Sequence, residues 1–301
     1  MTKTAQTPVR EHKRQQSHDE KEKFIPVSKY GHKSCVGFMP GNANKVNQDS
    51  FIECPNLRMN PEVFFFAVAD GHGFYGREVS TFVKQKLPNY LAAHQTFLTD
   101  NKAALTDSVE KVATELTAQE FDVNFSGTTL VSVLMQGKKL WCANSGDSRA
   151  LMARMLADEP GEQNPGRHWM SIALSRDHKP DERGEAERIF NKGGRVEAYQ
   201  DEEGNPLGPA RVWLMDQDIP GLAMSRSLGD LVAASVGVIY EPEILEYDIT
   251  PEDKFMVIGS DGIFEFLQNE EVVRIVVPFW KTGDMQGACD ALVKEAKQTW
   301  L

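Results

Sequence analysis

Two apolar runs that stop at the same dipeptide constrain the fold of this chain more than any other feature. The run VFFFAVAD ends at Asp70, which Gly71 and His72 follow, and the run KFMVIGSD ends at Asp261, which Gly262 follows. Both runs are too apolar for strands with one exposed face, so we expect two buried strands. One Asp-Gly pair alone is usually a tight turn. Two buried strands that each end in a carboxylate favour one shared site.

Two further aspartates lie in turns beside apolar runs: Asp49 in VNQDSF and Asp147 in NSGDSR. A carboxylate at a buried strand end must be paired, hydrogen-bonded or bound to a cation. His and Cys residues are too sparse there for zinc, whereas an all-oxygen set suits Mg²⁺, Mn²⁺ or Ca²⁺. Gly71 has no side chain, so its carbonyl could approach such an ion closely. Three roles stay open for His72: metal ligand, structural residue or proton donor.

The charge balance and the cysteines limit the partners and the compartment. The 33 Lys and Arg against 44 Asp and Glu give a formal net charge of −11, which argues against nucleic acid or an anionic membrane as the main partner. The 4 cysteines form no disulfide or zinc spacing, so we expect reduced thiols in a cytoplasmic or nuclear protein. No run is apolar enough to span a membrane, and the first residues resemble neither a signal peptide nor a myristoylation site.

The pattern of elements predicts an α+β fold. Clusters of short strands are interrupted by pairs of helical patterns, so we expect a β-sandwich of two antiparallel sheets flanked by pairs of antiparallel helices. Residues 1–23 are interpreted as a disordered arm of mixed charge, and residues 24–301 as the folded part. From about residue 177 to residue 236 the chain lacks clear periodicity, so we expect an irregular flap. Four polar residues of the flap are interpreted as structural anchors rather than substrate contacts: Asp177, His178, Arg226 and Asp230.

Eight motifs between Val46 and Leu267 follow one another in an order that resembles the metal-dependent serine/threonine protein phosphatases of type 2C. They are VNQDSF, FAVADGHG, SGTTLVSVL, ANSGDSRALM, DHKP with EAERIFNKGG, PGLAMSRSLGD, EPEI and IGSDGIFEFL. The segment RVWLMDQDIPGLAMSRSLGD is most similar to the plant and protist branch of that family. The resemblance implies that residues 24–301 are a phosphatase catalytic domain that acts on phosphorylated protein substrates. It also implies that a metal-activated water hydrolyses phosphoserine and phosphothreonine without a phosphoenzyme.

The resemblance implies a core site with two Mg²⁺ or Mn²⁺ ions. Asp70 would bridge the two ions, the carbonyl of Gly71 would bind the second ion, and Asp261 would bind the first. Asp49 would hold metal-bound waters, together with Gln48, which stands where many relatives carry glutamate. These roles fit the chemistry, because two divalent cations acidify a shared water and neutralise the phosphoryl oxygens during in-line attack.

The resemblance also assigns residues around this core. Asp147 matches a ligand of a third, weaker ion, and His72 matches the general acid that protonates the departing serine or threonine oxygen. Many relatives grip the substrate phosphate with an arginine a few residues before the position of Asp49. Here Lys45 is the only nearby cation in the sequence. Phosphate binding and plain exposure in a loop are two open interpretations of this lysine.

One ligand of the family pattern is absent from the sequence. Relatives carry a further aspartate, in an Asp-Asn or Asp-Asp pair, where the last core strand begins, and this chain ends in KEAKQTWL without that pair. We therefore expect the last core strand to be missing, with either a truncated chain or an incomplete first metal site. An alternative function stays open, a catalytically impaired relative that binds phosphoproteins or a partner. A calcium-stabilised structural protein would explain the acidic turns but not His72, and we expect a monomer.

Overall fold

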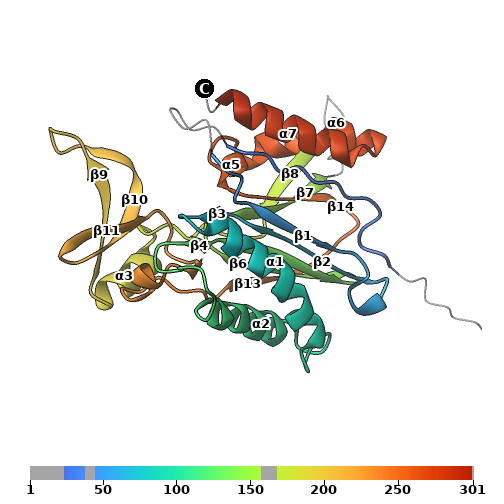
Figure 1. Ribbon diagram of the computed structural model, residues 1–301. Coiled ribbons are helices and arrows are strands. Elements are labelled where there is room, and N and C mark those ends of the chain that lie inside the picture. The colour runs from blue at the N-terminus through green and yellow to red at the C-terminus, as the bar shows by residue number, and fades with distance from the viewer. Residues whose placement is uncertain (1–23, 38–44, 157–167, 300–301) are drawn as a thin grey trace, which may run out of the picture.

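The centre of the fold is a five-stranded antiparallel sheet (Figure 1). The computed structural model describes residues 24–37, 45–156 and 168–299. The strand order is β1-β2-β5-β6-β13, and each neighbouring pair is antiparallel. The strands span Ser50–Cys54 (β1), Val63–Ala69 (β2), Leu130–Gln136 (β5), Lys139–Ser145 (β6) and Glu243–Asp248 (β13). Strand β2, which ends the first apolar run, therefore lies inside the sheet between β1 and β5.

Strand β2 is covered on both faces, as its sequence predicts. Val63 and Phe65 belong to a core that the sheet shares with a pair of helices. Phe64 and Phe66 belong to the core between this sheet and a second one. Successive side chains of a strand point to opposite faces, so a continuous apolar run is needed where both faces are covered. The end of β2 is consequently held in place from both sides.

A second antiparallel sheet, in the order β14-β7-β8, stacks on the first and completes a sandwich. Helices α1 and α2 cover the outer face of the first sheet, and α6 and α7 cover the second sheet (Figure 1). These elements span Gly76–Ala93 (α1), Asn101–Leu116 (α2), Arg149–Leu156 (β7), His168–Ala173 (β8), Asp253–Gly259 (β14), Asn269–Thr282 (α6) and Met285–Thr299 (α7). The predicted α+β sandwich flanked by helix pairs is confirmed.

The segment expected to be an irregular flap is more regular than its sequence predicts. After α3 (Arg183–Asn191) it forms a three-stranded antiparallel sheet, β11-β10-β9, which projects from the sandwich at the left of Figure 1. The strands span Gly194–Gln200 (β9), Pro206–Leu214 (β10) and Gln217–Leu222 (β11). Register shifts interrupt both strand pairs, so the alternation of polar and apolar residues that marks a strand is broken here.

A fourth, small sheet joins the segment after β2 to the end of the flap. Its order is β12-β4-β3, and its strands span Gly71–His72 (β3), Gly127–Thr128 (β4) and Leu228–Gly229 (β12). Gly127 pairs with His72 on one side and with Gly229 on the other. Asp230, directly after β12, is thereby brought close to His72. The remaining short elements are η1 (Leu57–Met59), α4 (Leu231–Ala234) and α5 (Asp261–Phe264).

Four expectations concern the N-terminal arm, membrane spans, the second buried strand and the last core strand. The arm of residues 1–23 lies outside the described residues. Among the described residues, no helix is both long and apolar enough to cross a membrane. The expectation of a second buried strand is wrong for β14: among the described residues it is the outer strand of its sheet, pairs with β7 alone and is only half-buried along most of its length. A cavity of ≈ 670 Å³ lies beside it, lined by residues 26–34 and by α7. The missing last strand stays a prediction.

Candidate metal centre

Three aspartates lie near one another where strands of the two sheets end. Asp49 directly precedes β1 and Asp70 directly follows β2, and because Ser50 pairs with Ala69 in antiparallel register, the two aspartates lie opposite each other. Asp261 opens α5, one residue after the end of β14. The Asp70 side chain lies within hydrogen-bonding reach of the Asp49 and Asp261 side chains. The structure thus brings together the two Asp-Gly ends that the sequence predicts to share a site.

The cluster is electrostatically unfavourable without a cation. Burial raises the pKa of Asp70 well above its usual range, and the charges of Asp49 and Asp261 raise it further. Burial raises the pKa of Asp49 as well, although a hydrogen bond with Asp70 opposes that shift. Among the described residues, no basic side chain forms an ion pair with any of the three carboxylates. A divalent cation would supply the missing positive charge.

The donor set fits a hard cation that keeps water ligands. Within the described ranges, no three side chains of His, Cys, Asp or Glu converge so as to hold one ion by themselves. Mg²⁺ typically binds through one or two carboxylates and retains several waters, and Mn²⁺ accepts the same oxygen ligands. The cluster of Asp49, Asp70 and Asp261 therefore suits such an ion better than zinc.

Gly71 has a packing role that the sequence interpretation did not include. A Cβ on Gly71 would lie 2.1 Å from the carbonyl oxygen of Gly76 and 2.6 Å from that of Gln48, so no larger residue fits here. The side chain of Gln48 donates to the carbonyl oxygen of Gly73 at 2.7 Å. The hydroxyl of Ser80 in α1 donates to the carbonyl oxygen of Gln48 at 2.5 Å. The loop before β1 is therefore locked against α1, and the expected contact of the Gly71 carbonyl with an ion stays a prediction.

Asp147 lies in the loop between β6 and β7, which the start of the flap segment holds in place. Asp177 accepts two hydrogen bonds from the Arg149 guanidinium, at 2.9 and 2.7 Å. The backbone N–H of Gly146 donates to Nδ1 of His178 at 3.1 Å, and the His178 N–H donates to the Gly146 carbonyl at 3.0 Å. Burial, and then the charge of Arg226, lowers the pKa of His178 to about 4. Asp177 and His178 thus have the framework role expected of them.

Lys179 pairs with Asp147, a contact that the sequence analysis missed. Asp147 is 3% exposed, and the Lys179 ammonium donates to its Oδ2 at 2.5 Å. Burial raises the pKa of Asp147, and the charge of Lys179 opposes that shift. The partners are far apart in sequence, so only the packing of the flap segment on the β6–β7 loop reveals the pair. Lys179 is paired with the carboxylate that a third ion would need as a ligand, so the two would compete for it.

The Lys179→Met variant is expected to bind divalent cations at Asp147 about tenfold more tightly than the wild type, because the competing ammonium is gone. The free energy of unfolding without metal should fall by about 3 kcal/mol, since Asp147 is left buried and unpaired. Calorimetric titration with Mn²⁺ and thermal melts in EDTA measure the two effects. Lys179→Arg keeps the charge and is the control. An unchanged affinity of the weakest Mn²⁺ site in Lys179→Met would contradict the prediction.

His72 lies beside the carboxylate cluster and contacts the end of the flap. Its Nε2 lies 2.6 Å from Oδ2 of Asp230, and the two side chains are 23% and 4% exposed. Burial alone would lower the pKa of His72, but the charge and hydrogen bond of Asp230 outweigh burial and raise it. The sequence interpretation treated Asp230 as a structural anchor. In the structure the Asp230 carboxylate contacts His72, the candidate general acid, directly.

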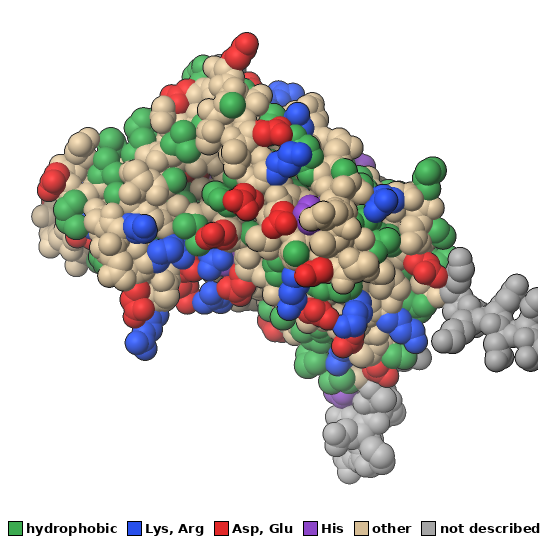
Figure 2. Space-filling model, turned by 90° about the horizontal axis from the view of Figure 1, so that it is seen from below, with side chains coloured by type: hydrophobic (Ala, Val, Ile, Leu, Met, Phe, Trp, Pro, Cys, Tyr) green, Lys and Arg blue, Asp and Glu red, His purple; other side chains and the backbone are tan. Residues whose placement is uncertain are grey.

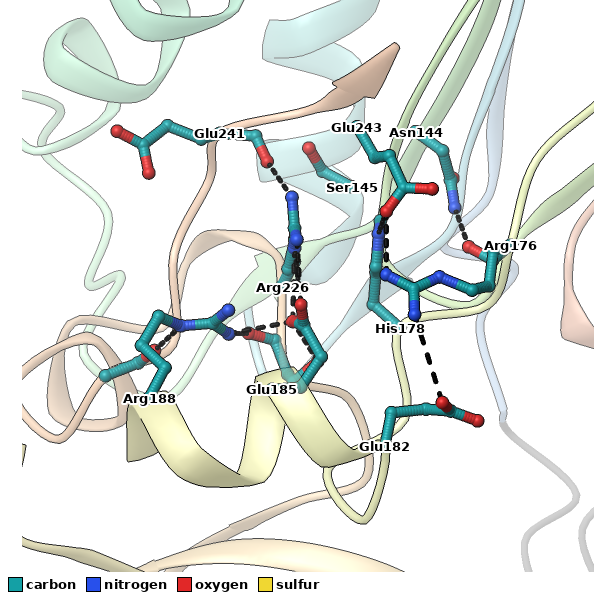
Figure 3. A network of polar contacts seen from close by, with 12 residues as sticks. Asn144, Ser145, Arg176, His178, Glu182, Glu185, Arg188, Arg226, Glu241 and Glu243 are labelled. Atoms are coloured by element: carbon teal, nitrogen blue, oxygen red, sulfur yellow. Dashed lines mark hydrogen bonds and ion pairs between the residues drawn. The ribbon is translucent and has the colours of Figure 1, made fainter. Parts of the chain in front are cut away.

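Arg226 forms the internal ion pair that was expected of it (Figure 3). Its guanidinium donates to Glu185 of α3 through Nη2 at 2.7 Å and through Nε at 3.1 Å. Arg188 and Ser225 donate to the same carboxylate at 2.8 and 2.6 Å. Burial alone would raise the pKa of Glu185, but these hydrogen bonds hold it well below its usual range. The network fixes the base of the flap to the sandwich.

Basic residues lie near Asp49, and the sequence predicted only Lys45 among them. Lys45 is exposed, and its charge partly opposes the rise in the pKa of Asp49 that burial causes. Arg77 comes from the first turn of α1 and lines a pocket of ≈ 370 Å³ beside Asp49. No ion pair joins Arg77 to any other described residue. Arg77 was missed because it reaches this pocket only through the packing of α1 on β1, which the sequence does not show.

Comparison with known proteins agrees with this geometry. A family model described as Protein phosphatase 2C matches residues 37–299. "Probable protein phosphatase 2C 35" of Arabidopsis thaliana is 36% identical over 284 residues, which cover 88% of this chain and 77% of that protein. "Probable protein phosphatase 2C 72" of the same plant is 38% identical over 242 residues, which cover 77% of this chain and 69% of that protein.

A solved structure shares the fold. The crystal structure of a serine-threonine phosphatase 2C from Toxoplasma gondii superposes with a TM-score of 0.72, at 20% identity, and covers 92% of each chain. At that identity the likeness shows the fold alone, whereas the family model covers most of the sequence. This chain belongs to the protein phosphatase 2C family, whose members are metal-dependent serine/threonine phosphatases.

Proposed function

We propose that this chain hydrolyses phosphoserine and phosphothreonine in proteins at the cluster of Asp49, Asp70 and Asp261, with two Mg²⁺ or Mn²⁺ ions at this core site and a third at Asp147. The observation that carries the proposal is the approach of three partly buried carboxylates that lack a basic partner among the described residues. Membership of the family supports the reaction class. The alternative of a catalytically impaired binding protein is not favoured by these matches.

In this proposal, some residues position the reacting groups and His72 transfers a proton. Bound divalent cations would acidify a ligated water and neutralise the phosphoryl oxygens. The β1 and β2 ends fix Asp49 opposite Asp70, and α5 presents Asp261 from the second sheet. His72 supplies a proton to the serine or threonine oxygen as the P–O bond breaks, because an alkoxide is a poor leaving group. Lys45, which is exposed and whose charge acts on Asp49, neutralises part of the phosphate charge.

The partners of the proposed enzyme are phosphorylated proteins, and we place it as a monomer in the cytoplasm or nucleus. The formal net charge of −11 supports neither nucleic acid nor an anionic membrane as a partner. On the face shown in Figure 2, acidic and basic side chains are interspersed over the described residues. A mixed surface of this kind favours recognition through particular contacts with a phosphoprotein over long-range attraction to a polyanion.

Removal of metal is expected to abolish turnover. After treatment with EDTA and dialysis the chain should not hydrolyse a phosphothreonine peptide, and added Mn²⁺ or Mg²⁺ should restore hydrolysis, because the carboxylate cluster alone cannot activate water. Phosphate release measures the rate, and Ca²⁺ at the same concentration is a comparison with a larger ion of equal charge. Turnover that persists in EDTA would refute the proposed chemistry. Calorimetric binding of the phosphopeptide without turnover in Mn²⁺ would instead support the binding-protein alternative.

The Lys45→Ala variant is expected to raise KM for a phosphothreonine peptide about tenfold, because one charged contact to the phosphate is lost. The value of kcat should change by less than about threefold, since the contact is made in both the ground and the transition state. Steady-state kinetics with Mn²⁺ measures both values. Lys86→Ala is the matched control, since Lys86 pairs with Glu115 on the helix pair at 3.5 Å. Equal KM values in wild type and Lys45→Ala would assign Lys45 to an exposed loop without a role in binding.

A further inference from the structure

The imidazole of His72 is held through one nitrogen. Nε2 of His72 lies 2.6 Å from Oδ2 of Asp230, and an ionised carboxylate can only accept, so Nε2 carries the proton and donates it. No residue of the described ranges hydrogen-bonds to Nδ1 of His72. The side chain of His72 keeps 23% exposure. The nitrogen left free for a substrate is therefore Nδ1.

Asp230 is itself fixed from several directions. The hydroxyl of Ser227 donates to the same Oδ2 at 2.6 Å, and the Asp230 N–H donates to the carbonyl of Ser126 at 3.0 Å. A Cβ on Gly127 would lie 2.1 Å from Oδ2 of Asp230, so the carboxylate fills the space that this glycine leaves. The carboxylate therefore has little freedom to move away from His72.

The backbone of Asp230 also indicates a functional position. Its φ of 47° and ψ of 50° lie in the left-handed region, which costs energy for a residue with a side chain, although aspartate is among those that tolerate it. The small sheet β12-β4-β3 holds this conformation, because β12 ends directly before Asp230 and β3 contains His72. Strain that the surrounding structure maintains is typical of active sites.

We propose that Asp230, supported by Ser227, is a positioning residue that orients His72 so that Nδ1 delivers the proton to the leaving serine or threonine oxygen. The inference rests on the proposed function, in which His72 is the acid. As the P–O bond to the substrate oxygen breaks, the proton on Nδ1 of the imidazolium moves to that oxygen. The imidazole is left neutral with Nε2–H still donated to Asp230, and the carboxylate does not take up a proton, as in a catalytic triad.

Leaving groups of different basicity test this role in the Mn²⁺-loaded full chain. In Asp230→Asn we expect kcat for a phosphothreonine peptide to fall about 30-fold, within the range of general acid catalysis, because an amide no longer fixes the tautomer. Hydrolysis of p-nitrophenyl phosphate should fall less than about threefold, since p-nitrophenolate leaves without a proton. Under alkaline conditions in which the imidazole is neutral, nitrogen NMR of labelled histidine should show one Nε2–H tautomer in the metal-free wild type and a mixture in Asp230→Asn.

Two further variants keep the result interpretable. Asp253→Asn changes another aspartate with a buried side chain, which lies at the opposite end of β14 from Asp261 and accepts from Arg154 and Tyr247. The hydrolysis of both substrates should be unaffected. Ser227→Ala removes only the hydroxyl behind Asp230, and a selective loss of about threefold with the peptide is expected. This milder change carries the test if Asp230→Asn does not fold.

His72→Gln separates this inference from the proposed function. A selective loss in His72→Gln without one in Asp230→Asn or Ser227→Ala would overturn the role of Asp230 and leave His72 as the acid. Equal losses with both substrates in His72→Gln would overturn the acid role of His72, and with it the positioning role of Asp230. Selective losses in His72→Gln and Asp230→Asn together support the inference.

Discussion

Asp70→Asn is expected to abolish phosphatase activity and at the same time to stabilise the metal-free chain. Loss of the central carboxylate should lower kcat/KM by at least about 10³-fold, because divalent cations supply several kcal/mol of transition-state stabilisation. In EDTA the same change removes a buried negative charge that is repelled by the charges of Asp49 and Asp261. The free energy of unfolding should therefore rise by about 2 kcal/mol, the scale of an uncompensated buried charge.

The pH dependence distinguishes this explanation from a general effect of the substitution. The pKa of Asp70 is raised in the folded chain, so the folded state binds the proton more tightly than the unfolded state. The stability of the metal-free wild type should then fall as pH rises from the unfolded pKa near about 4 to the raised folded pKa. Asp70→Asn lacks this loss, so its advantage should be larger at about pH 8 than at about pH 5.

Thermal melts in EDTA at the two pH values measure the effect, and Mn²⁺ titration calorimetry measures the loss of metal binding. Asp253→Asn is the matched control, because Asp253 accepts two hydrogen bonds from the Arg154 guanidinium. Removing its charge should destabilise the chain at neutral pH, opposite in sign to Asp70→Asn. If Asp70→Asn melted below the wild type in EDTA at about pH 8, the cluster would not be repulsive and the fit to a cation would lose its main support.

The sequence predicted the parts of the site that short stretches of chain define. Asp70 and Asp261 are each preceded by an apolar run, and the two faces of β2 show why such a run must be continuous. The convergence of Asp49 and Asp70 also follows from local structure, since they flank neighbouring antiparallel strands. These residues could be found because the sequence pattern and the local geometry of the candidate site involve the same few positions.

The other half of the site could not be predicted from local patterns. Lys179 contacts Asp147, Asp230 contacts His72, and Arg77 approaches the pocket beside Asp49, each across a large separation in sequence. Such contacts depend on how the sheets and helices pack together, and no periodicity encodes them. The flap sheet escaped prediction for a different reason, because its register shifts break the alternation of side chains. The sequence therefore did not reveal the charged residues that lie beside the predicted site residues and orient them.

The network at the base of the flap predicts the largest loss of stability. Glu185→Ala is expected to lower the free energy of unfolding by about 4 kcal/mol and the melting temperature by about 10 °C, because two arginines lose their buried partner. Arg226 and Arg188 have side chains only 14% and 22% exposed, so water cannot fully replace the carboxylate. Figure 3 shows both guanidinium groups directed at Glu185.

The matched control lies on the same helix. Glu187 pairs with Arg183 at 3.1 Å, and both side chains are largely exposed, so Glu187→Ala should cost less than about 1 kcal/mol. The pKa of Glu185 is held below its usual range, so its contribution is fully present above the unfolded pKa near about 4.3 and is lost as pH falls through the lower folded pKa. The difference between wild type and Glu185→Ala should therefore shrink under acidic conditions. Equal melting temperatures for Glu185→Ala and Glu187→Ala at neutral pH would show that the flap does not depend on this network, and Arg226 would then be open to a role at the substrate.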